Sequence, residues 1–248
     1  MKSTTRTALI TGASRGLGLV VAQRLAADGL RCILLARDGD ALDAAVGSLK
    51  ASGADACAMR LDLEQAGDPR ELANAVRAVT DRLDVLVLNA ALGGIRVPLP
   101  DYPHDLWRQL FQVNVHAVHA LLSATHPMLR ESPAGRVVFV STGVARRWKA
   151  TTGAYGASKA AMEAIAGIYA VETADTSIRV NTINPGPTRT AMRASAFPDE
   201  DPSVLKTPED IVPLFVDLSS PDCAIHGETI NADVWLERGR DVQRAIRD

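Results

Sequence analysis

Short runs of β-branched residues and leucine alternate along this chain with longer segments of helical periodicity. The expected strands cover residues 7–11, 31–36, 56–61, 85–89, 136–141, 178–184 and 229–232, and the expected helices cover residues 16–28, 69–81, 105–129, 155–173 and 208–218. Helices between consecutive strands act as crossover connections, so neighbouring strands run parallel and both faces of the sheet are covered. The pattern predicts an α/β fold: a Rossmann-type, doubly wound, parallel sheet of seven strands with helices on both faces.

The composition narrows the kind of protein. A length of 248 residues with 47% hydrophobic content suits one α/β domain, so we expect residues 1–248 to form a single domain. A formal net charge of −2 gives no electrostatic reason to expect nucleic acid or a membrane surface as a partner. Three cysteines without a CxxC spacing, and the lack of any long apolar run, predict no disulfide framework, no zinc site and a cytoplasmic location.

A glycine-rich segment, TGASRGLG, lies between the first expected strand and the first expected helix. Glycines at this place let the backbone approach a pyrophosphate, which the amino end of the following helix attracts. A plain tight turn is the alternative for a glycine cluster taken by itself. With its flanking strand and helix, the segment predicts a dinucleotide site formed by Gly12, Ser14, Arg15, Gly16, Leu17 and Gly18.

The end of the second expected strand indicates which dinucleotide binds. A carboxylate about 20 residues after the glycine motif would bind a ribose 2′-hydroxyl, but the strand ends in Ala36 and Arg37. Guanidinium groups from Arg15 and Arg37 favour a 2′-phosphate, because arginine binds phosphate in a fork geometry. NADP(H) is therefore predicted over NAD(H). The alternative is that Arg37 is only a solvated charge and Asp38 binds the ribose.

The segment YGASK begins an expected helix and places Tyr155 and Lys159 one turn apart on the same face. A free tyrosine has a pKa of about 10, so acid–base work near neutrality requires a decrease of roughly 2 to 3, or about 3 to 4 kcal/mol. One ammonium at about 4 to 5 Å in an effective dielectric of about 20 supplies about 4 kcal/mol. A single lysine is therefore enough to tune the phenol, although the spacing alone also fits an ordinary amphipathic helix.

These motifs occur together with Asn89 and Ala90 after the fourth expected strand, Asn114 in the long helix and Asn-Pro-Gly at 184–186 after the sixth strand. In this combination the chain resembles the short-chain dehydrogenase/reductase family over nearly its whole length. Its TGxxxGxG and YxxxK patterns resemble the single-domain branch of that family.

The resemblance implies a role for each matching residue. Tyr155 would be the general acid for carbonyl reduction, and Lys159 would lower the pKa of Tyr155 and hold the nicotinamide ribose. Asn114 would position a water that relays protons to Lys159. Further cofactor contacts implied by the family pattern are those of Asp62, Leu63, Asn89, Ala90, Pro185, Gly186, Thr188 and Thr190.

Two positions depart from the family pattern. The usual Asn-Asn-Ala-Gly after the fourth strand is here Leu-Asn-Ala-Ala, so Ala91 carries a methyl group where glycine allows close approach of the cofactor. The family serine, thirteen residues before the tyrosine, is Thr142, and Ser141 directly precedes it. Adjacent strand residues point to opposite sides, so we predict Thr142 as the catalytic hydroxyl and Ser141 as its competitor.

The sequence thus predicts an NADP(H)-dependent oxidoreductase that interconverts a small-molecule carbonyl and a secondary alcohol by hydride transfer. One alternative is a dinucleotide-binding sensor or scaffold without turnover, and another is a 3-ketoacyl-thioester reductase. The basic stretch 146–149 would suit an acyl carrier or a phosphate ester, or is simply a solvated turn. His116 and His119 have a spacing that suits a metal site, but they have no carboxylate or cysteine companion, so no metal is predicted.

Two further expectations concern segments near the predicted site. The irregular segment 190–206 is a candidate lid. In the helix that follows Tyr155, residues 160–171 contain one charged residue, Glu163, and the helix is apolar nearly all round. One face packs on the sheet and the other needs a partner, so a homodimer or homotetramer is predicted.

Overall fold

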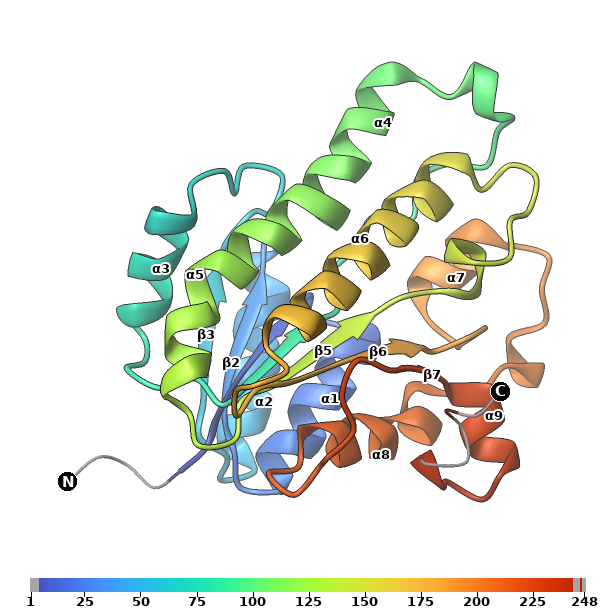
Figure 1. Cartoon of the computed structure of the whole chain (residues 1–248). Coiled ribbons are helices and arrows are strands. Elements are labelled where there is room, and N and C mark those ends of the chain that lie inside the picture. Colours follow the sequence, from blue (N-terminus) through green and yellow to red (C-terminus); the bar gives the residue numbers. More distant parts are fainter. Residues whose placement is uncertain (1–4, 243–245, 247–248) are drawn as a thin grey trace.

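The structure, a computed structural model, describes residues 5–242 and 246. Its strands form one all-parallel sheet in the order β3-β2-β1-β4-β5-β6-β7 (Figure 1). Their bounds are β1 Thr7–Thr11, β2 Arg31–Ala36, β3 Ala56–Arg60, β4 Val85–Leu88, β5 Arg136–Val140, β6 Arg179–Asn184 and β7 Thr229–Asn231. The predicted α/β fold with seven parallel strands is confirmed.

Helices cover both faces of the sheet (Figure 1). One layer consists of α1 Gly16–Ala27, α2 Gly39–Ala51, α8 Pro208–Ser219 and α9 Ala232–Glu237, and the other of α3 Pro69–Arg77, α5 Ala117–Glu131 and α6 Gly153–Glu172. Alternate residues of β1 enter the two layers, since Ala8 and Ile10 pack in the α1 layer and Leu9 packs in the α5 layer. Among the described residues, no helix combines the length and apolarity needed to cross a membrane.

The sequence pattern leaves residues 37–55 without an element, but the structure has α2 there. Its buried residues are Leu42, Ala45, Val46 and Leu49, which follow the spacing of one helical face, and Asp38 caps its first turn. One of these four residues is an alanine, and the helix as a whole contains four alanines and two glycines, so the apolar period is weak in the sequence. The short helix α9, which begins directly after β7, was likewise not predicted.

The long helix expected over residues 105–129 has three parts. It begins as α4 His104–Phe111, passes through a π-helical turn at Gln112–His116 and continues as α5. In Figure 1, α4 projects beyond the sheet, next to the start of α6. A π turn inserts one residue into the helical repeat, and such turns often occur at functional sites.

The loops that follow the strands meet at the carboxyl-terminal edge of the sheet. Strand β1 lies between β2 and β4, so the chain changes direction there and leaves a crevice outside the strand ends. At the opposite edge, buried Asp84 accepts hydrogen bonds from the backbone N–H of Thr7 at 2.9 Å and from Oγ of Ser132 at 2.6 Å. The two edges therefore differ in how they use polar groups.

Candidate active site

The glycine motif forms a tight turn between β1 and α1. Gly12 and Gly16 have φ angles of 66° and 58°, which side chains rarely adopt. A Cβ at Gly18 would lie 2.5 Å from the carbonyl oxygen of Gly12 and 2.6 Å from Nδ2 of Asn89, so only glycine fits there. Arg15 precedes α1 without a side-chain cap bond, and the first-turn amides of α1 have no side-chain cap. The turn thus offers backbone donors to an anion.

A set of polar contacts holds the loop after β4 against the glycine turn. The hydroxyl of Thr11 accepts hydrogen bonds from the backbone N–H groups of Asn89 at 3.0 Å and Ala90 at 2.9 Å. The side-chain amide of Asn89 donates to the carbonyl oxygen of Thr11 at 2.9 Å. The sequence-predicted residues Asn89 and Ala90 therefore lie beside the glycine motif, with Asn89 joining the two loops.

A cationic side chain, that of Arg37, directly follows the end of β2. Arg37 is exposed and pairs with Glu64 at 2.7 Å. Asp38, the alternative ribose ligand, accepts a hydrogen bond from the backbone N–H of Ala41 at 3.2 Å and caps α2. Its carboxylate is thus engaged at the start of a helix.

A second arginine at this corner was missed by the sequence analysis. Arg60 ends β3 beside Ala36 of β2, and a Cβ at Gly39 would lie 3.1 Å from its guanidinium carbon. Arg60 also pairs with Asp43 of α2. A charged residue at the last position of an otherwise apolar strand was the available signal.

Asp62 and Leu63 follow β3 at the same edge of the sheet. Asp62 accepts a hydrogen bond from the backbone N–H of Glu64 at 3.0 Å, and Leu63 is buried. The turn they form carries Glu64, the partner of Arg37, so it borders the predicted adenosine end of the cofactor site.

Helix α6 brings Tyr155 and Lys159 to the end of β5. The side chain of Thr142 acts on Tyr155 in the sense that favours the phenolate, but burial outweighs this effect and raises the pKa of Tyr155 to about 12. The ammonium of Lys159 donates to the carbonyl oxygen of Val140 at 2.7 Å, and burial lowers its pKa to about 8. The pKa of Tyr155 therefore moves opposite to the decrease expected from the sequence, because burial dominates.

The two hydroxyls at the end of β5 point to different partners. Thr142 contacts Tyr155, whereas Ser141 donates a hydrogen bond to the carboxylate of Glu163. This separation follows from strand alternation, as the sequence analysis expected. Of the two hydroxyls, Thr142 is thus the one beside the phenol.

The π turn buries Asn114 between two elements of the site. Its side-chain amide exchanges two hydrogen bonds with the backbone of Leu92, at 2.8 and 3.0 Å. It also donates to Oγ of Ser158 at 3.0 Å. Asn114 therefore connects the loop after β4 to α6 at Ser158, the residue before Lys159. Its predicted action on a water molecule stays a prediction.

The loop after β6 faces the glycine turn. Gly186 has a φ of 64°, and a Cβ there would overlap the carboxylate of Asp233, which pairs with Lys206. The hydroxyl of Thr188 lies 3.3 Å from the carbonyl oxygen of Pro185 and donates to it. These contacts hold the loop close to the start of α9.

Thr190 connects this loop to the candidate lid. Its hydroxyl caps helix α7 Ala191–Ala196 by accepting a hydrogen bond from the backbone N–H of Arg193 at 3.2 Å. A Cβ at Gly16 would lie 4.0 Å from the methyl carbon of Thr190, so the two loops face each other across the crevice. The loop after β6 and the glycine motif therefore approach each other at Thr190 and Gly16.

The segment after Thr190 packs on the loop after β4. The ring of Phe197 stacks with Arg96 at 4.5 Å and with Arg193 at 3.7 Å, each measured from the guanidinium carbon to the ring centroid. Arg193 also forms a double hydrogen bond with Glu200. A cavity of about 390 Å³ lies within this segment and is lined by residues between Arg189 and Leu205. The candidate lid therefore packs on the loop after β4 and surrounds a cavity, and its motion stays a prediction.

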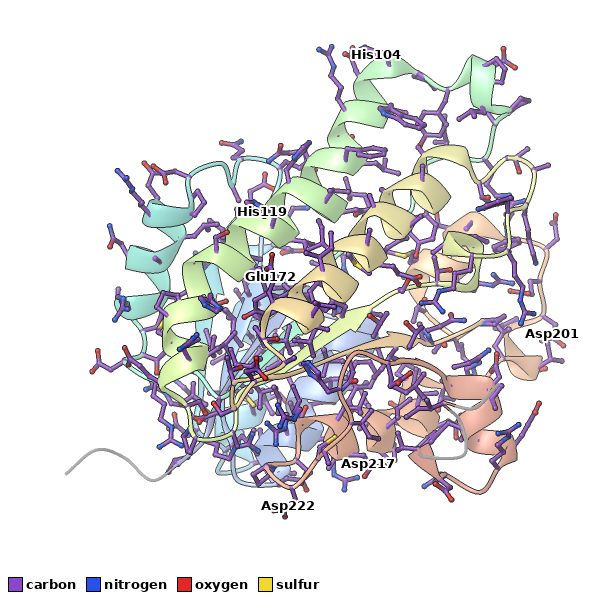
Figure 2. The ribbon with its side chains drawn as sticks, viewed as in Figure 1. His104, His119, Glu172, Asp201, Asp217 and Asp222 are labelled. Atoms are coloured by element: carbon purple, nitrogen blue, oxygen red, sulfur yellow. The ribbon has the colours of Figure 1, made fainter. Side chains whose placement is uncertain are left out.

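The two histidines singled out in the sequence are exposed: His116 ends the π turn and His119 lies on α5. His119 is on the exposed side of α5, and His104 is at the tip of α4 (Figure 2). Across residues 5–242 and 246, no group of three histidine, cysteine, aspartate or glutamate side chains is placed to hold a metal ion.

Comparison with known proteins identifies the family of the chain. A family model described as short chain dehydrogenase matches residues 6–201. The chain is 41% identical over 220 residues to the uncharacterized oxidoreductase YciK of Escherichia coli K12, covering 88% of this chain and 87% of YciK. It is 34% identical over 214 residues to a rhamnolipids biosynthesis 3-oxoacyl-(acyl-carrier-protein) reductase of Pseudomonas aeruginosa, covering 84% of this chain and 82% of that reductase.

A solved structure of a similar protein has the same fold. The crystal structure of a short chain dehydrogenase from Escherichia coli CFT073, complexed with NADPH, has 40% sequence identity and a TM-score of 0.87, and the match covers 92% of this chain and 96% of that chain. The family model and these relatives extend over most of the chain. The protein therefore belongs to the short-chain dehydrogenase/reductase family.

Proposed function

We propose that this protein is an NADP(H)-dependent oxidoreductase that interconverts a carbonyl and a secondary alcohol. The observation that carries the proposal is the convergence of Tyr155, Lys159 and Thr142 at the end of β5, where the phenol has a hydroxyl partner and a buried ammonium lies one helical turn away. The short chain dehydrogenase of Escherichia coli CFT073, which was crystallised with NADPH, supports the choice of cofactor.

The residues present fit a dinucleotide phosphate. The glycine turn leaves backbone N–H groups at the start of α1 without a side-chain cap, and Gly18 keeps the helix close to the turn. At the end of β2, Arg37 is exposed and the nearest acid along the chain, Asp38, caps a helix. A 2′-phosphate therefore has a cation to bind, and a ribose 2′-hydroxyl has no free carboxylate at Asp38.

The chemistry divides between the cofactor and the chain. NADPH supplies the hydride when it is bound. The hydroxyl of Thr142 donates a hydrogen bond to the substrate oxygen, and Tyr155 gives its proton to that oxygen. Because burial raises the pKa of Tyr155 to about 12, the phenol keeps its proton at neutral pH and acts as the acid in carbonyl reduction. Lys159, with a pKa of about 8, is mostly protonated at pH 7 and stabilises the phenolate that forms.

The proposal is tested with NADPH and a panel of aldehydes and ketones, followed by the absorbance of the nicotinamide, with the matching alcohols and NADP tested in reverse. We expect turnover of at least one compound, and Tyr155→Phe should lower kcat by at least about 10²-fold. Binding of NADPH, measured by fluorescence, should be unchanged in this variant. Tight binding of NADPH without any turnover would instead support the sensor alternative.

A ketoacyl thioester is the second candidate substrate. The reductase of Pseudomonas aeruginosa named above is a 3-oxoacyl-(acyl-carrier-protein) reductase by name. Near the predicted site, Arg147, Trp148 and Lys149 are exposed, and Trp148 is 88% exposed. A thioester substrate predicts a higher kcat/KM for a 3-ketoacyl thioester than for the corresponding simple ketone. Equal values for the two compounds would remove this candidate.

We also infer that the protein forms a homodimer or homotetramer. The outer face of α6 exposes Ile168 by 59% and Val171 by 78%, while Met162 and Ala166 of the same helix are buried. Burial of these apolar side chains in a second copy would stabilise the assembly. Light scattering at micromolar concentration tests this inference, and a monomer would contradict it.

A further inference from the structure

Glu163 lies one helical turn after Lys159, behind the proposed proton-transfer site. Its side chain is 10% exposed. One carboxylate oxygen, Oε1, accepts a hydrogen bond from the hydroxyl of Ser141, and the other, Oε2, accepts one from Nε of Arg146 at 2.6 Å. A nearly buried carboxylate with a partner on each oxygen is held in one position.

Arg146 joins this carboxylate to two further elements. It follows the turn at Gly143–Ala145 after Thr142, and a second guanidinium nitrogen donates to Oγ1 of Thr229 on β7 at 2.6 Å. Its side chain is 60% exposed, so solvent reaches the guanidinium but much less of the carboxylate. The pair therefore has a buried negative end and a solvated positive end.

Few charges face the ammonium of Lys159. On its own helix, the charge that acts on it is the carboxylate of Glu163, one turn further along. From β5 it meets the carbonyl oxygen of Val140 at 2.7 Å, and the charge of Arg146 lies beyond Glu163. Burial favours the neutral amine, and Glu163 opposes this by raising the pKa of Lys159.

We propose that Glu163 is a positioning residue for proton transfer: its carboxylate keeps the Lys159 ammonium charged, and Arg146 weakens its effect on Lys159. The proposal rests on the roles proposed above for Lys159 and Tyr155. A carboxylate that served only to anchor Ser141 would need its shape and hydrogen bonds but not its charge. A substitution that changes the charge but keeps the shape therefore distinguishes an electrostatic role toward Lys159 from a purely structural role toward Ser141.

Two substitutions change the charge in opposite senses. Glu163→Gln keeps an oxygen that accepts from Ser141 and removes the negative charge, so the pKa of Lys159 should fall. Arg146→Gln removes the positive charge that offsets Glu163, so the pKa of Lys159 should rise. A purely structural role predicts a loss of packing in both variants and no opposite shifts.

The titration is read directly by ¹³C NMR of protein labelled at the lysine Cε atoms. The chain has five lysines, so Lys159 is assigned by its absence in Lys159→Arg. We expect the pKa to decrease by about 1 in Glu163→Gln and to increase measurably in Arg146→Gln. Arg108→Gln is the matched control, because it breaks another exposed arginine–carboxylate pair, on α4, and should leave the pKa of Lys159 unchanged.

The same variants are then followed by kcat against pH. The part of the kcat–pH profile that depends on the ionisation of Lys159 should move to lower pH in Glu163→Gln and to higher pH in Arg146→Gln. Unchanged pKa values, or shifts of the same sign in both variants, would overturn the proposal. Because Arg146 is largely solvated, its variant keeps the test open if Glu163→Gln does not fold. The NMR titration uses no substrate, so absence of turnover in the wild-type protein would overturn the proposed function and leave the electrostatic result standing.

Discussion

At the amino-terminal edge of the sheet, the carboxylate of Asp84 accepts hydrogen bonds from a backbone N–H, a serine hydroxyl and Nε of Arg82, and its pKa is lowered because these bonds outweigh burial. At the carboxyl-terminal edge, burial dominates instead, raising the pKa of Tyr155 and lowering that of Lys159. The first edge stabilises the charged form of its buried group. The second edge holds groups whose charged forms are disfavoured by burial unless a neighbouring group stabilises them.

The backbone differs between the edges in the same way. At the amino-terminal edge, Arg6 and Arg136 donate to the carbonyl oxygens of Ser219, Ser220 and Pro221, which join distant loops. At the carboxyl-terminal edge, the turn before α1 has no side-chain cap. Hydrogen-bonding groups thus hold the protein together at the amino-terminal edge, and at the carboxyl-terminal edge they stay available for a ligand. Substitutions at the first should unfold the protein, and substitutions at the second should impair activity at nearly constant stability.

The largest expected effect is at the first edge. Asp84→Ala leaves the N–H of Thr7, the hydroxyl of Ser132 and the guanidinium of Arg82 without their shared acceptor, and should lower the free energy of unfolding by about 3 to 5 kcal/mol. Denaturant unfolding measures this change. Asp105→Ala, which removes an exposed carboxylate paired with Arg108, is the control and should leave the midpoint unchanged. A small effect of Asp84→Ala would show that this edge is not held by its buried charge.

The next effect concerns the second edge and separates its two hydroxyls. Thr142→Ala should lower kcat by about 10² to 10³, because the hydroxyl stabilises the charge that develops on the substrate oxygen. Thr142→Ser should stay active and Ser141→Ala should have a mild effect, since Ser141 donates to Glu163. Steady-state kinetics on any substrate found decides this, with unfolding midpoints as the control. A crippled Ser141→Ala enzyme would make the assignment of Thr142 wrong.

The comparison can also be drawn from the pH dependence of stability. The lowered pKa of Asp84 contributes stability above its unfolded value of about 4, which is lost as pH falls through the folded pKa. The pKa of Lys159 is about 8 when folded and 10.5 when unfolded, so between these values the unfolded state binds more protons. Stability should therefore rise with pH from about 8 to 9, until Cys32, and above pH 10 Tyr155 and Tyr169, act in the opposite sense because burial raises their pKa values to about 12.

Unfolding titrations of Asp84→Asn and Lys159→Met test the two ends of this range. The first variant should have a smaller acid-side slope and keep the alkaline one, and the second should keep the acid-side slope and lose the rise above pH 8. If both variants kept both slopes, the pH dependence would arise elsewhere in the molecule.

Much of this architecture was predictable from local patterns. The strand runs are strongly apolar, so β1, β2 and β5 lie at the predicted positions, and the offset between Thr142 and Tyr155 places both residues in contact. Helix α2 escaped prediction because small residues dilute its apolar face. Local periodicity is informative where side chains are large and is weak where they are small.

The electrostatics were harder to predict. The spacing of Tyr155 and Lys159 predicts that an ammonium is near, but the degree of burial of the two groups depends on how the whole chain packs around them. The ion pair of Glu163 with Arg146 joins residues from separate elements. Such contacts follow from tertiary packing, which no short segment of sequence contains.

The smallest predicted effect is on the choice of cofactor at the end of β2. NADPH should bind at least about tenfold more tightly than NADH, a difference in binding free energy of about 1.4 kcal/mol. The reason is that Arg37 can bind the 2′-phosphate, whereas the carboxylate of Asp38 is engaged in capping α2 and is not free to bind a ribose 2′-hydroxyl. Arg37→Gln should weaken NADPH and leave NADH unchanged. Glu64→Gln should strengthen NADPH, since Glu64 competes for the guanidinium at 2.7 Å. Asp38→Asn retains the cap and is the control, so a loss of NADH binding in that variant, measured by calorimetry, would instead identify Asp38 as the ribose ligand.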